Sequence, residues 1–360
     1  RTSSYSPNVQ NLPRDSRIRS IFVAPPGHVI LSADYSQLEL RTLAQVTYTL
    51  FGFSKMCDLL NAGVDLHSHF AGMFLNVSIE ELSEEDRRKA KAANFGFPGG
   101  LGIKKFIQYA KATYGILFTE EEAGDLKNKW LETFPEVRLY LESSAIESFK
   151  ESRLLREEGE NGESQKINDS IAWIFTGIVR GQTFTKSTRR EYSSEEIEWA
   201  FGLIEAANFP KKEAFQRDIT KRRGSRELCE NFMRQFCKVI HRSGRVRGYT
   251  TYCQSKNTPF QGLAADVAKE ALFDLTKRGF RVINFIHDEY LILLPIDDSL
   301  RERSQTVSKI LISAMQRHCP DVAIEVSTEW MFQWGKKGTH CLEDTGALVP
   351  KPSSKEEEAR

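Results

Sequence analysis

The stretch Val29-Ile-Leu-Ser-Ala-Asp-Tyr-Ser-Gln-Leu-Glu-Leu-Arg41 decides how this chain folds. The apolar run over 29–33 has the length of a buried β-strand. It delivers Asp34 at its end, after which the apolar spacing becomes helical. An isolated aspartate at such a junction is usually a helix N-cap. A carboxylate backed by a core strand is also well placed to hold a metal ion, and the rest of the chain distinguishes the two interpretations.

A second acidic stretch lies far along the chain, in Arg281-Val-Ile-Asn-Phe-Ile-His-Asp-Glu-Tyr-Leu-Ile-Leu-Leu-Pro295. Two apolar segments around a polar tip predict a β-hairpin that presents His287, Asp288 and Glu289. Such a tip is usually a solvated turn. Flanking strands this apolar, however, place the acids at the edge of a core.

A basic stretch lies between the two acidic ones. The segment 83–86 is acidic, as expected where a helix starts. Arg87, Lys91 and Phe95 then follow at intervals of four residues on one helix face, and the row spans about 12 Å. Two cations and a ring suit the phosphates and base of a nucleotide, although a solvated basic helix is the plainer reading. Pro98 should end or kink this helix.

Composition gives few constraints on function. The chain has 360 residues, 40% hydrophobic and 28% charged, with 50 Lys+Arg against 49 Asp+Glu. These are values of an ordinary globular protein, and affinity for nucleic acid would need a local basic surface. The sequence contains no membrane span or signal peptide, and its scattered cysteines favour reduced thiols. We therefore expect a cytoplasmic protein (in the host cytoplasm if it is viral), with an organelle as the alternative.

Taken together and in the order in which they occur along the chain, the first acidic stretch, the basic stretch and the second acidic stretch resemble motifs A, B and C of the family A DNA polymerases, the bacterial DNA polymerase I family with its phage-like relatives. The resemblance covers residues 1–149 and 242–335. It implies an α+β fold: a right-hand polymerase palm with an antiparallel sheet, helical fingers, and a thumb largely missing from this chain and expected in a longer parent chain. Palm would occupy 1–45 and 242–342, and fingers 46–149. Residues 150–241 would be a mostly helical lineage-specific insertion, and 343–360 a disordered tail.

The resemblance also implies roles for single residues. Asp34 and Asp288 would bind two Mg²⁺ ions about 3.5–4 Å apart, with Mn²⁺ able to substitute, and Glu289 would assist catalysis. The positions implied for nucleotide binding are Gln37, Glu39, His67, Arg87, Lys91 and Phe95. The positions implied for primer-template DNA binding are Arg1, Asn8, Gln10, Asn257, Gln261 and His287.

Two positions depart from the family pattern. Gly99 stands where the family usually has Tyr, and Cys253 where it usually has Arg. Neither change touches the acids, so the predicted function is a template-directed DNA polymerase. It would extend a primer 3′-hydroxyl with dNTPs, release pyrophosphate and work with replication accessory proteins.

Three alternatives remain: a single-subunit RNA polymerase, a catalytically idle DNA-binding scaffold and a two-metal nuclease. Glu39, as a ribose gate, and Phe95 argue against the first, although Glu39 could instead simply pair with Arg41 or another cation on the surface. The retained aspartates argue against the second. The basic row of the predicted helix has no role in the third.

Overall fold

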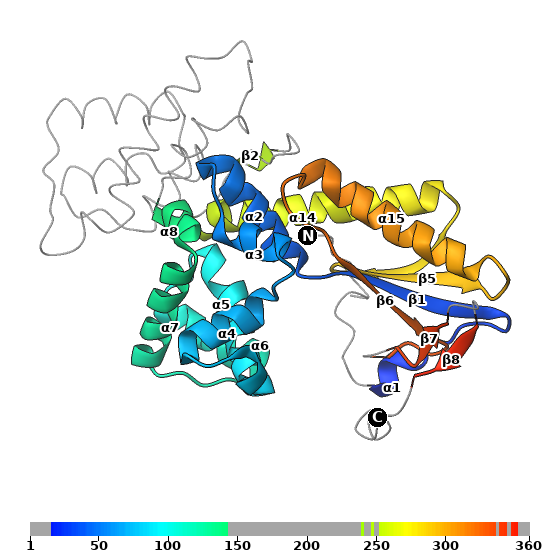
Figure 1. Cartoon of the computed structure of the whole chain (residues 1–360), viewed down its shortest axis with the longest axis horizontal. Helices are drawn as coiled ribbons and strands as arrows, with labels where there is room; N and C mark the ends of the chain where they lie inside the picture. The colour runs from blue at the N-terminus through cyan, green and yellow to red at the C-terminus, as the bar shows by residue number, and fades with distance from the viewer. Residues whose placement is uncertain are drawn as a thin grey trace, which may run out of the picture. The chain divides into compact units, whose positions relative to one another are not determined.

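The computed structural model describes residues 16–142, 239–240, 246–247, 252–335, 338–343 and 347–351 (Figure 1). The predictions for Arg1, Asn8 and Gln10, and nearly all of the expected insertion, lie outside these residues. The chain divides into two compact units. The first consists of Arg1–Tyr48, Phe53–Leu66 and Phe260–Arg360, and the second of Thr49–Gly52 and His67–Pro259.

The first unit is built on a six-stranded sheet in the order β4-β5-β1-β6-β7-β8. The strands are β1 (His28–Tyr35), β4 (Arg281–Ile286), β5 (Glu289–Pro295), β6 (Val326–Met331), β7 (His340–Leu342) and β8 (Leu348–Pro350). All of these pairings are antiparallel. β1 lies inside the sheet because its apolar run is buried on both faces. β8 lies in the tail that the sequence predicts to be disordered, where pairing with β7 satisfies its backbone.

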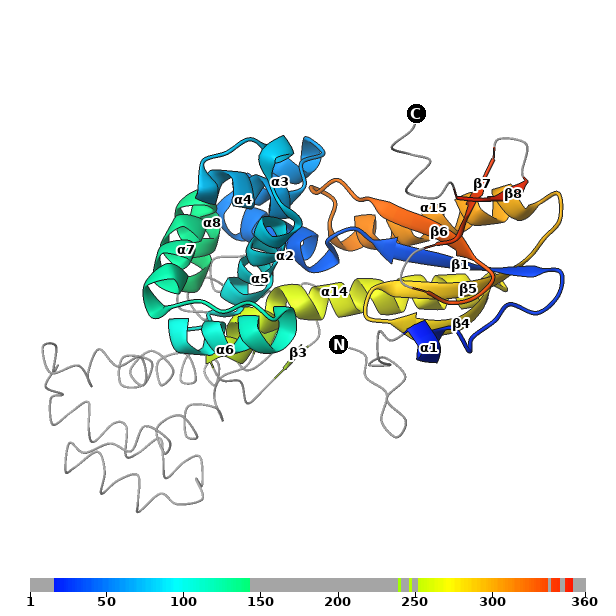
Figure 2. The ribbon, with the colours of Figure 1, turned by 90° about the horizontal axis from the view of Figure 1, so that it is seen from below.

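Two helices cover one face of this sheet. They are α15 (Leu300–His318) and the part of α14 (Tyr252–Lys277) from Phe260 onward, which run along the same side of the strands in Figures 1 and 2. The Tyr35 hydroxyl donates to Leu311 O at 2.7 Å, and the Tyr290 hydroxyl donates to Ala268 O at 2.6 Å. Because side chains alternate along a strand, the residues next to these tyrosines lie on the opposite face.

The remaining helices of the first unit are short or begin at the sheet. They are α1 (Ser16–Arg19), α2 (Leu38–Phe51) and α3 (Lys55–Asn61). The last residues of α2 belong to the second unit. Mixed helix and antiparallel sheet confirm the predicted α+β class.

The second unit is mostly helical where it is described. Its elements are α4 (Leu66–Leu75), η2 (Ile79–Glu81), α5 (Glu84–Gly96), η3 (Phe97–Gly99), α6 (Ile103–Tyr114), α7 (Glu120–Thr133), α8 (Pro135–Glu142), the start of α14 and the pair β2 (Val239–Ile240) and β3 (Val246–Arg247). Phe97, Phe106, Trp130 and Phe134 are fully buried and form its aromatic core. α5 begins at a capping box in which Ser83 and Asp86 bind each other's backbone N–H groups.

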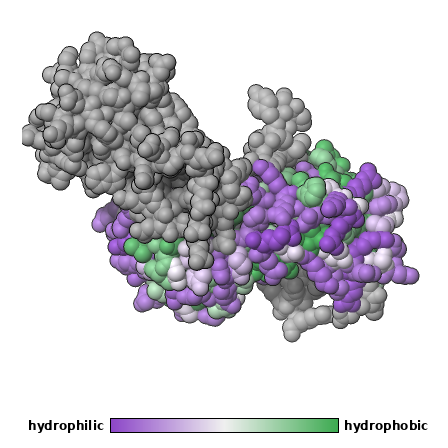
Figure 3. Space-filling model, turned by 90° about the horizontal axis from the view of Figure 1, so that it is seen from above, coloured by the Kyte–Doolittle hydropathy of each residue, from purple (hydrophilic) through white to green (hydrophobic). Residues whose placement is uncertain are grey.

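The face of the described residues in Figure 3 is mostly hydrophilic, with smaller hydrophobic areas. Among the described residues, no helix has the length and apolar composition needed to cross a membrane.

Candidate active site

Asp34 lies near the end of β1, after the buried run 29–33. It stands directly opposite Glu289 of β5 in the antiparallel register. Paired residues of an antiparallel ladder share a face of the sheet. Since the neighbouring Tyr35 and Tyr290 contact the helices, both carboxylates belong to the face opposite α14 and α15. Each is half-buried.

Ser32 orients one of these acids. Its Oγ donates to Glu289 Oε1 at 2.7 Å, and the serine is only 7% exposed. Ser32 comes two residues before Asp34 and therefore lies on the same face. Sequence reasoning missed this residue, although a hydroxyl inside an apolar strand was the available signal.

The turn between β4 and β5 carries the third acid. The predicted hairpin is confirmed: the strands pair up to Ile286 and Glu289 across a turn made of His287 and Asp288. His287 is exposed and has φ 57°, which is uncommon for a residue other than glycine. A two-residue hairpin loop requires a positive φ at its first position. The register thus places Glu289, and not Asp288, directly opposite Asp34.

These acids suit a hard cation. Like charges placed directly across a strand pair destabilise a sheet, and a divalent ion reverses that cost by taking carboxylate oxygens as ligands. Within the described residues, no group of three or more His, Cys, Asp or Glu side chains is arranged as a complete metal site. Two carboxylates on one face are nevertheless the kind of ligand set through which Mg²⁺ usually binds, with phosphates and water completing its shell.

Tyr290 links the two distant acidic stretches. Its side chain is fully buried. Burial raises the pKa of Tyr290 well above its ordinary value, and the charges of Tyr35, Asp288 and Asp34 raise it further. The phenol stays neutral at physiological pH and adds no negative charge to the site.

The connection from β1 to α2 is held in a defined shape. Gln37 has φ 57°, and its Nε2 donates to Asp65 at 3.0 Å. Its Oε1 is buried and accepts no hydrogen bond from the described residues. Arg41 holds the turn by donating to Ser36 O at 2.6 Å, and it pairs with Glu325 at 3.2 Å. The Gln37 side chain is thus held in place through its amide nitrogen.

Glu39 lies in the first turn of α2. Its Oε2 accepts a long hydrogen bond, 3.5 Å, from Gln261 Nε2. Thr42 Oγ1 donates to Glu39 O and to Phe260 O at 3.0 and 2.9 Å, which joins α2 to α14. The structure therefore brings together two predicted site residues, Glu39 and Gln261, while Arg41 pairs with another acid.

In the second unit, α5 presents the predicted row. Arg87 and Phe95 are half-buried and Lys91 is exposed, whereas Ala90 and Ala93 are buried in the helical core. The helix ends at Gly96 and continues as a 3₁₀ turn through Pro98, which confirms the predicted end. Nucleotide binding by the row stays a prediction.

His67 is only 3% exposed, and its ring lies 5.5 Å from the Phe95 ring. Trp130 Nε1, which can only donate, binds Asn94 Oδ1 at 2.7 Å. This contact fixes the amide orientation, so Asn94 Nδ2 must be the atom that faces His67 Nδ1 at 2.8 Å. An imidazole that accepts at Nδ1 carries its proton on Nε2. Sequence reasoning missed Asn94 and Trp130, and a polar residue on the buried side of an alanine-rich helix was the available signal.

The predicted DNA-binding residues are distributed over both units. Asn257 lies on α14 in the second unit and is half-buried, while Gln261 and His287 belong to the first unit. Arg1, Asn8 and Gln10 fall outside the described residues.

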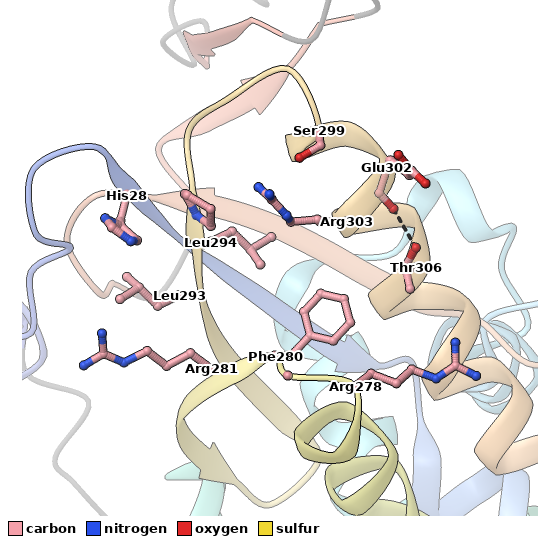
Figure 4. A pocket seen from close by; sticks show the side chains of 12 residues that line it. His28, Arg278, Phe280, Arg281, Leu293, Leu294, Ser299, Glu302, Arg303 and Thr306 are labelled. Atoms are coloured by element: carbon pink, nitrogen blue, oxygen red, sulfur yellow. Dashed lines mark hydrogen bonds between the residues drawn. The ribbon is translucent and has the colours of Figure 1, made fainter.

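A cavity of about 830 Å³ lies at the other end of β1, beside His28 (Figure 4). Asp34 lies six residues further along β1 than His28, or about 20 Å. Figure 4 shows Arg278 and Arg281 pointing away from each other on either side of Phe280. The cavity is therefore separate from the acids.

The sequence is similar to those of known proteins. The profile of DNA polymerase family A matches residues 1–157. DNA polymerase I of Aquifex aeolicus is 26% identical over 348 residues, which cover 93% of this chain and 44% of the relative. DNA polymerase I of Rhizobium leguminosarum is 38% identical over 151 residues, covering 40% and 14%. The thermostable DNA polymerase I of Thermus aquaticus is 25% identical over 344 residues, covering 92% and 31%.

The match to DNA polymerase family A thus covers residues 1–157, and the similarity to DNA polymerase I extends over 93% of the chain. A solved structure described as the POL domain of Pol1 from M. smegmatis in complex with DNA primer-template and dNTP shares the fold of this chain. The TM-score is 0.52 at 24% identity, covering 92% of this chain and 45% of that one. The chain spans less than half the length of these curated relatives.

Proposed function

We propose that this chain forms the palm and fingers of a template-directed DNA polymerase, which adds deoxynucleotides to a primer 3′-hydroxyl and releases pyrophosphate. The observation that carries the proposal is the pairing of Asp34 with Glu289, beside Asp288, on the sheet face away from the helices. The match to DNA polymerase family A and the shared fold support it. Primer-template DNA and dNTPs are the proposed partners, with accessory proteins and a longer parent chain.

In this proposal, Asp34 and Asp288 hold the Mg²⁺ or Mn²⁺ ions, with Glu289 as an accessory. When bound, two divalent ions neutralise phosphate charge and lower the pKa of the attacking hydroxyl. Ser32 keeps the Glu289 carboxylate oriented through its hydrogen bond. The buried, neutral Tyr290 fixes the strand that carries the acids, because its hydroxyl is anchored on α14.

The second unit would supply the nucleotide contacts. Arg87 and Lys91 carry charges suited to the triphosphate, and the half-buried ring of Phe95 offers a flat surface for the base. His67 would add an Nε2–H donor, which the Asn94 contact keeps in the required tautomer. A phosphate oxygen needs a donor, so this tautomer supports the predicted role.

Sugar selection would fall to Glu39. A 2′-hydroxyl entering beside this carboxylate would displace its solvation or its Gln261 contact. This favours a DNA polymerase over the RNA polymerase alternative. The free cysteines among the described residues, including buried Cys57 and Cys319, agree with a reducing compartment, and we propose the cytoplasm.

Primer extension tests the proposal. Asp34→Asn and Asp288→Asn should abolish extension while primer-template binding stays largely intact, because other groups hold the DNA. Asp298→Asn, which removes an exposed carboxylate from the same unit, is the matched control. Extension within about tenfold of the parent in either variant, a barrier change under about 1.4 kcal/mol, would contradict the metal assignment. An inactive parent that still binds DNA would favour the idle scaffold.

A further inference from the structure

The turn that follows α5 contains three glycines, at positions 99, 100 and 102. Gly100 has φ 74°, in the left-handed region, so its backbone conformation explains the glycine. Gly99 lies in the 3₁₀ turn η3, and its φ is not positive. Backbone conformation therefore gives no reason for glycine at position 99.

The side chain of Asn257 gives that reason. A Cβ atom built on Gly99 would lie 2.6 Å from Asn257 Oδ1 and 2.8 Å from its Cγ, and it would also clash with Nδ2. Carbon contacts are normally about 3.5–4.0 Å. The carboxamide therefore rests directly on the backbone of Gly99. At Gly102, in the same turn, an added Cβ would meet nothing within 4 Å.

The carboxamide and the turn are both held by neighbouring helices. Asn257 Nδ2 donates to Cys253 O, one helical turn earlier, at 3.0 Å. On the other side, Lys127 Nζ of α7 donates to Leu101 O at 3.1 Å. An asparagine amide has two N–H donors, so the bond to Cys253 leaves one N–H and the Oδ1 acceptor for a ligand.

We infer that Gly99 is a positioning residue, which seats the Asn257 carboxamide so that it can read the minor groove of the primer-template. The inference rests on the proposed polymerase function. Minor-groove acceptors such as adenine N3 and thymine O2 occur in both orientations of an A·T pair. A single oriented N–H can therefore check base-pair geometry without sequence preference. Any side chain at position 99 would take the space of the carboxamide.

A double-mutant cycle of thermal stability tests whether Gly99 positions the Asn257 side chain, without measuring activity. In the full chain, Gly99→Ala should lower Tm by about 2–4 °C, because the new methyl group displaces Asn257. In the Asn257→Ala background the same change should lower Tm by less than about 1 °C, since the space is then empty. Gly102→Ala is the matched control and should behave alike in both backgrounds. An equal decrease in Tm from Gly99→Ala in both backgrounds would show that Gly99 does not position the Asn257 side chain.

A DNA probe tests the reading. Adenine in the primer-template is replaced, one position at a time, by 3-deazaadenine, which lacks the N3 acceptor, and single-nucleotide insertion is measured. The parent and Gly102→Ala should lose about tenfold at one position, while Gly99→Ala and Asn257→Ala should show no such loss. A merely structural role for Gly99 would leave the position-specific loss in place, and that result would overturn the inference.

The outcomes separate this inference from the proposed function. If the parent and Asn257→Ala respond alike at every position, Asn257 does not read the groove, even though Asp34-dependent extension still stands. If the parent does not extend primers at all, the proposed function and the reading role both fail. The stability cycle then still decides whether Gly99 seats the side chain.

Discussion

Glu289 stands directly opposite Asp34, and this pairing makes a prediction about stability as well as catalysis. Glu289→Gln removes one of the opposed charges, while its amide oxygen can still accept the hydrogen bond from Ser32. Like charges opposite each other in a sheet cost about 0.2–1 kcal/mol. At an unfolding entropy of about 2.1 cal/mol/K per residue, about 1 kcal/mol shifts the Tm of a 360-residue chain by about 1–2 °C. Without divalent ions, Glu289→Gln should therefore raise Tm by up to about 1–2 °C.

Magnesium should raise the Tm of the parent more than that of a variant that lacks one of the site carboxylates. At ten times its Kd, a ligand that binds only the folded state stabilises it by about 1.4 kcal/mol, which corresponds to about 2 °C in a chain of this length. The parent should gain this stabilisation, and Asp34→Asn should gain less than half of it because a ligand is gone. The measurement is thermal unfolding of each variant in a MgCl₂ titration at constant ionic strength.

Asp298→Asn controls for the loss of any exposed carboxylate from the first unit, and it should keep the response of the parent. Two results would refute the reasoning. One is an equal Mg²⁺ response in the parent, Asp34→Asn and Glu289→Gln. The other is a lower Tm for Glu289→Gln in the absence of divalent ions, which would mean that the opposed charges do not repel.

Three further changes test other parts of the site. Glu39→Ala should raise ribonucleotide insertion relative to deoxyribonucleotide insertion by at least about tenfold, or about 1.4 kcal/mol. An unchanged ratio, measured on one template, would contradict the role of Glu39 in selecting the sugar. Tyr290→Phe should cost about 1 kcal/mol near neutral pH by deleting the bond to Ala268 O. Burial raises the pKa of Tyr290 above its ordinary value of 10.0, so above pH 10 the unfolded chain can ionise this phenol while the folded chain keeps it protonated. The parent should therefore lose stability as the pH rises above 10, and denaturant unfolding should show the difference between parent and Tyr290→Phe becoming smaller there. A constant difference would contradict the assigned shift. Trp130→Phe should free the Asn94 amide to rotate, so that nitrogen NMR detects both His67 tautomers, whereas a retained single Nε2–H form would show that another contact sets it.

Local sequence determined the elements that carry the chemistry. The run 29–33 is apolar at every position except Ser32, so its length and composition indicated a core strand that delivers Asp34 at its end. The four-residue spacing set the row on α5, and Pro98, which lacks a backbone N–H, ended that helix. Apolar segments on both sides of His287 and Asp288 were enough to predict a hairpin. Each of these properties depends only on residues within one short stretch of the chain.

The contacts within the site depended on tertiary structure. Strand register, which the whole sheet sets, placed Glu289 directly opposite Asp34. The tautomer of His67 follows from a tryptophan on another helix, and the glycine at position 99 has its reason in Asn257. Each of these contacts joins segments far apart in the chain. Their geometry arises only when helices and strands pack together, because a side chain's partners across an interface depend on the position of both elements and not on the sequence of either one.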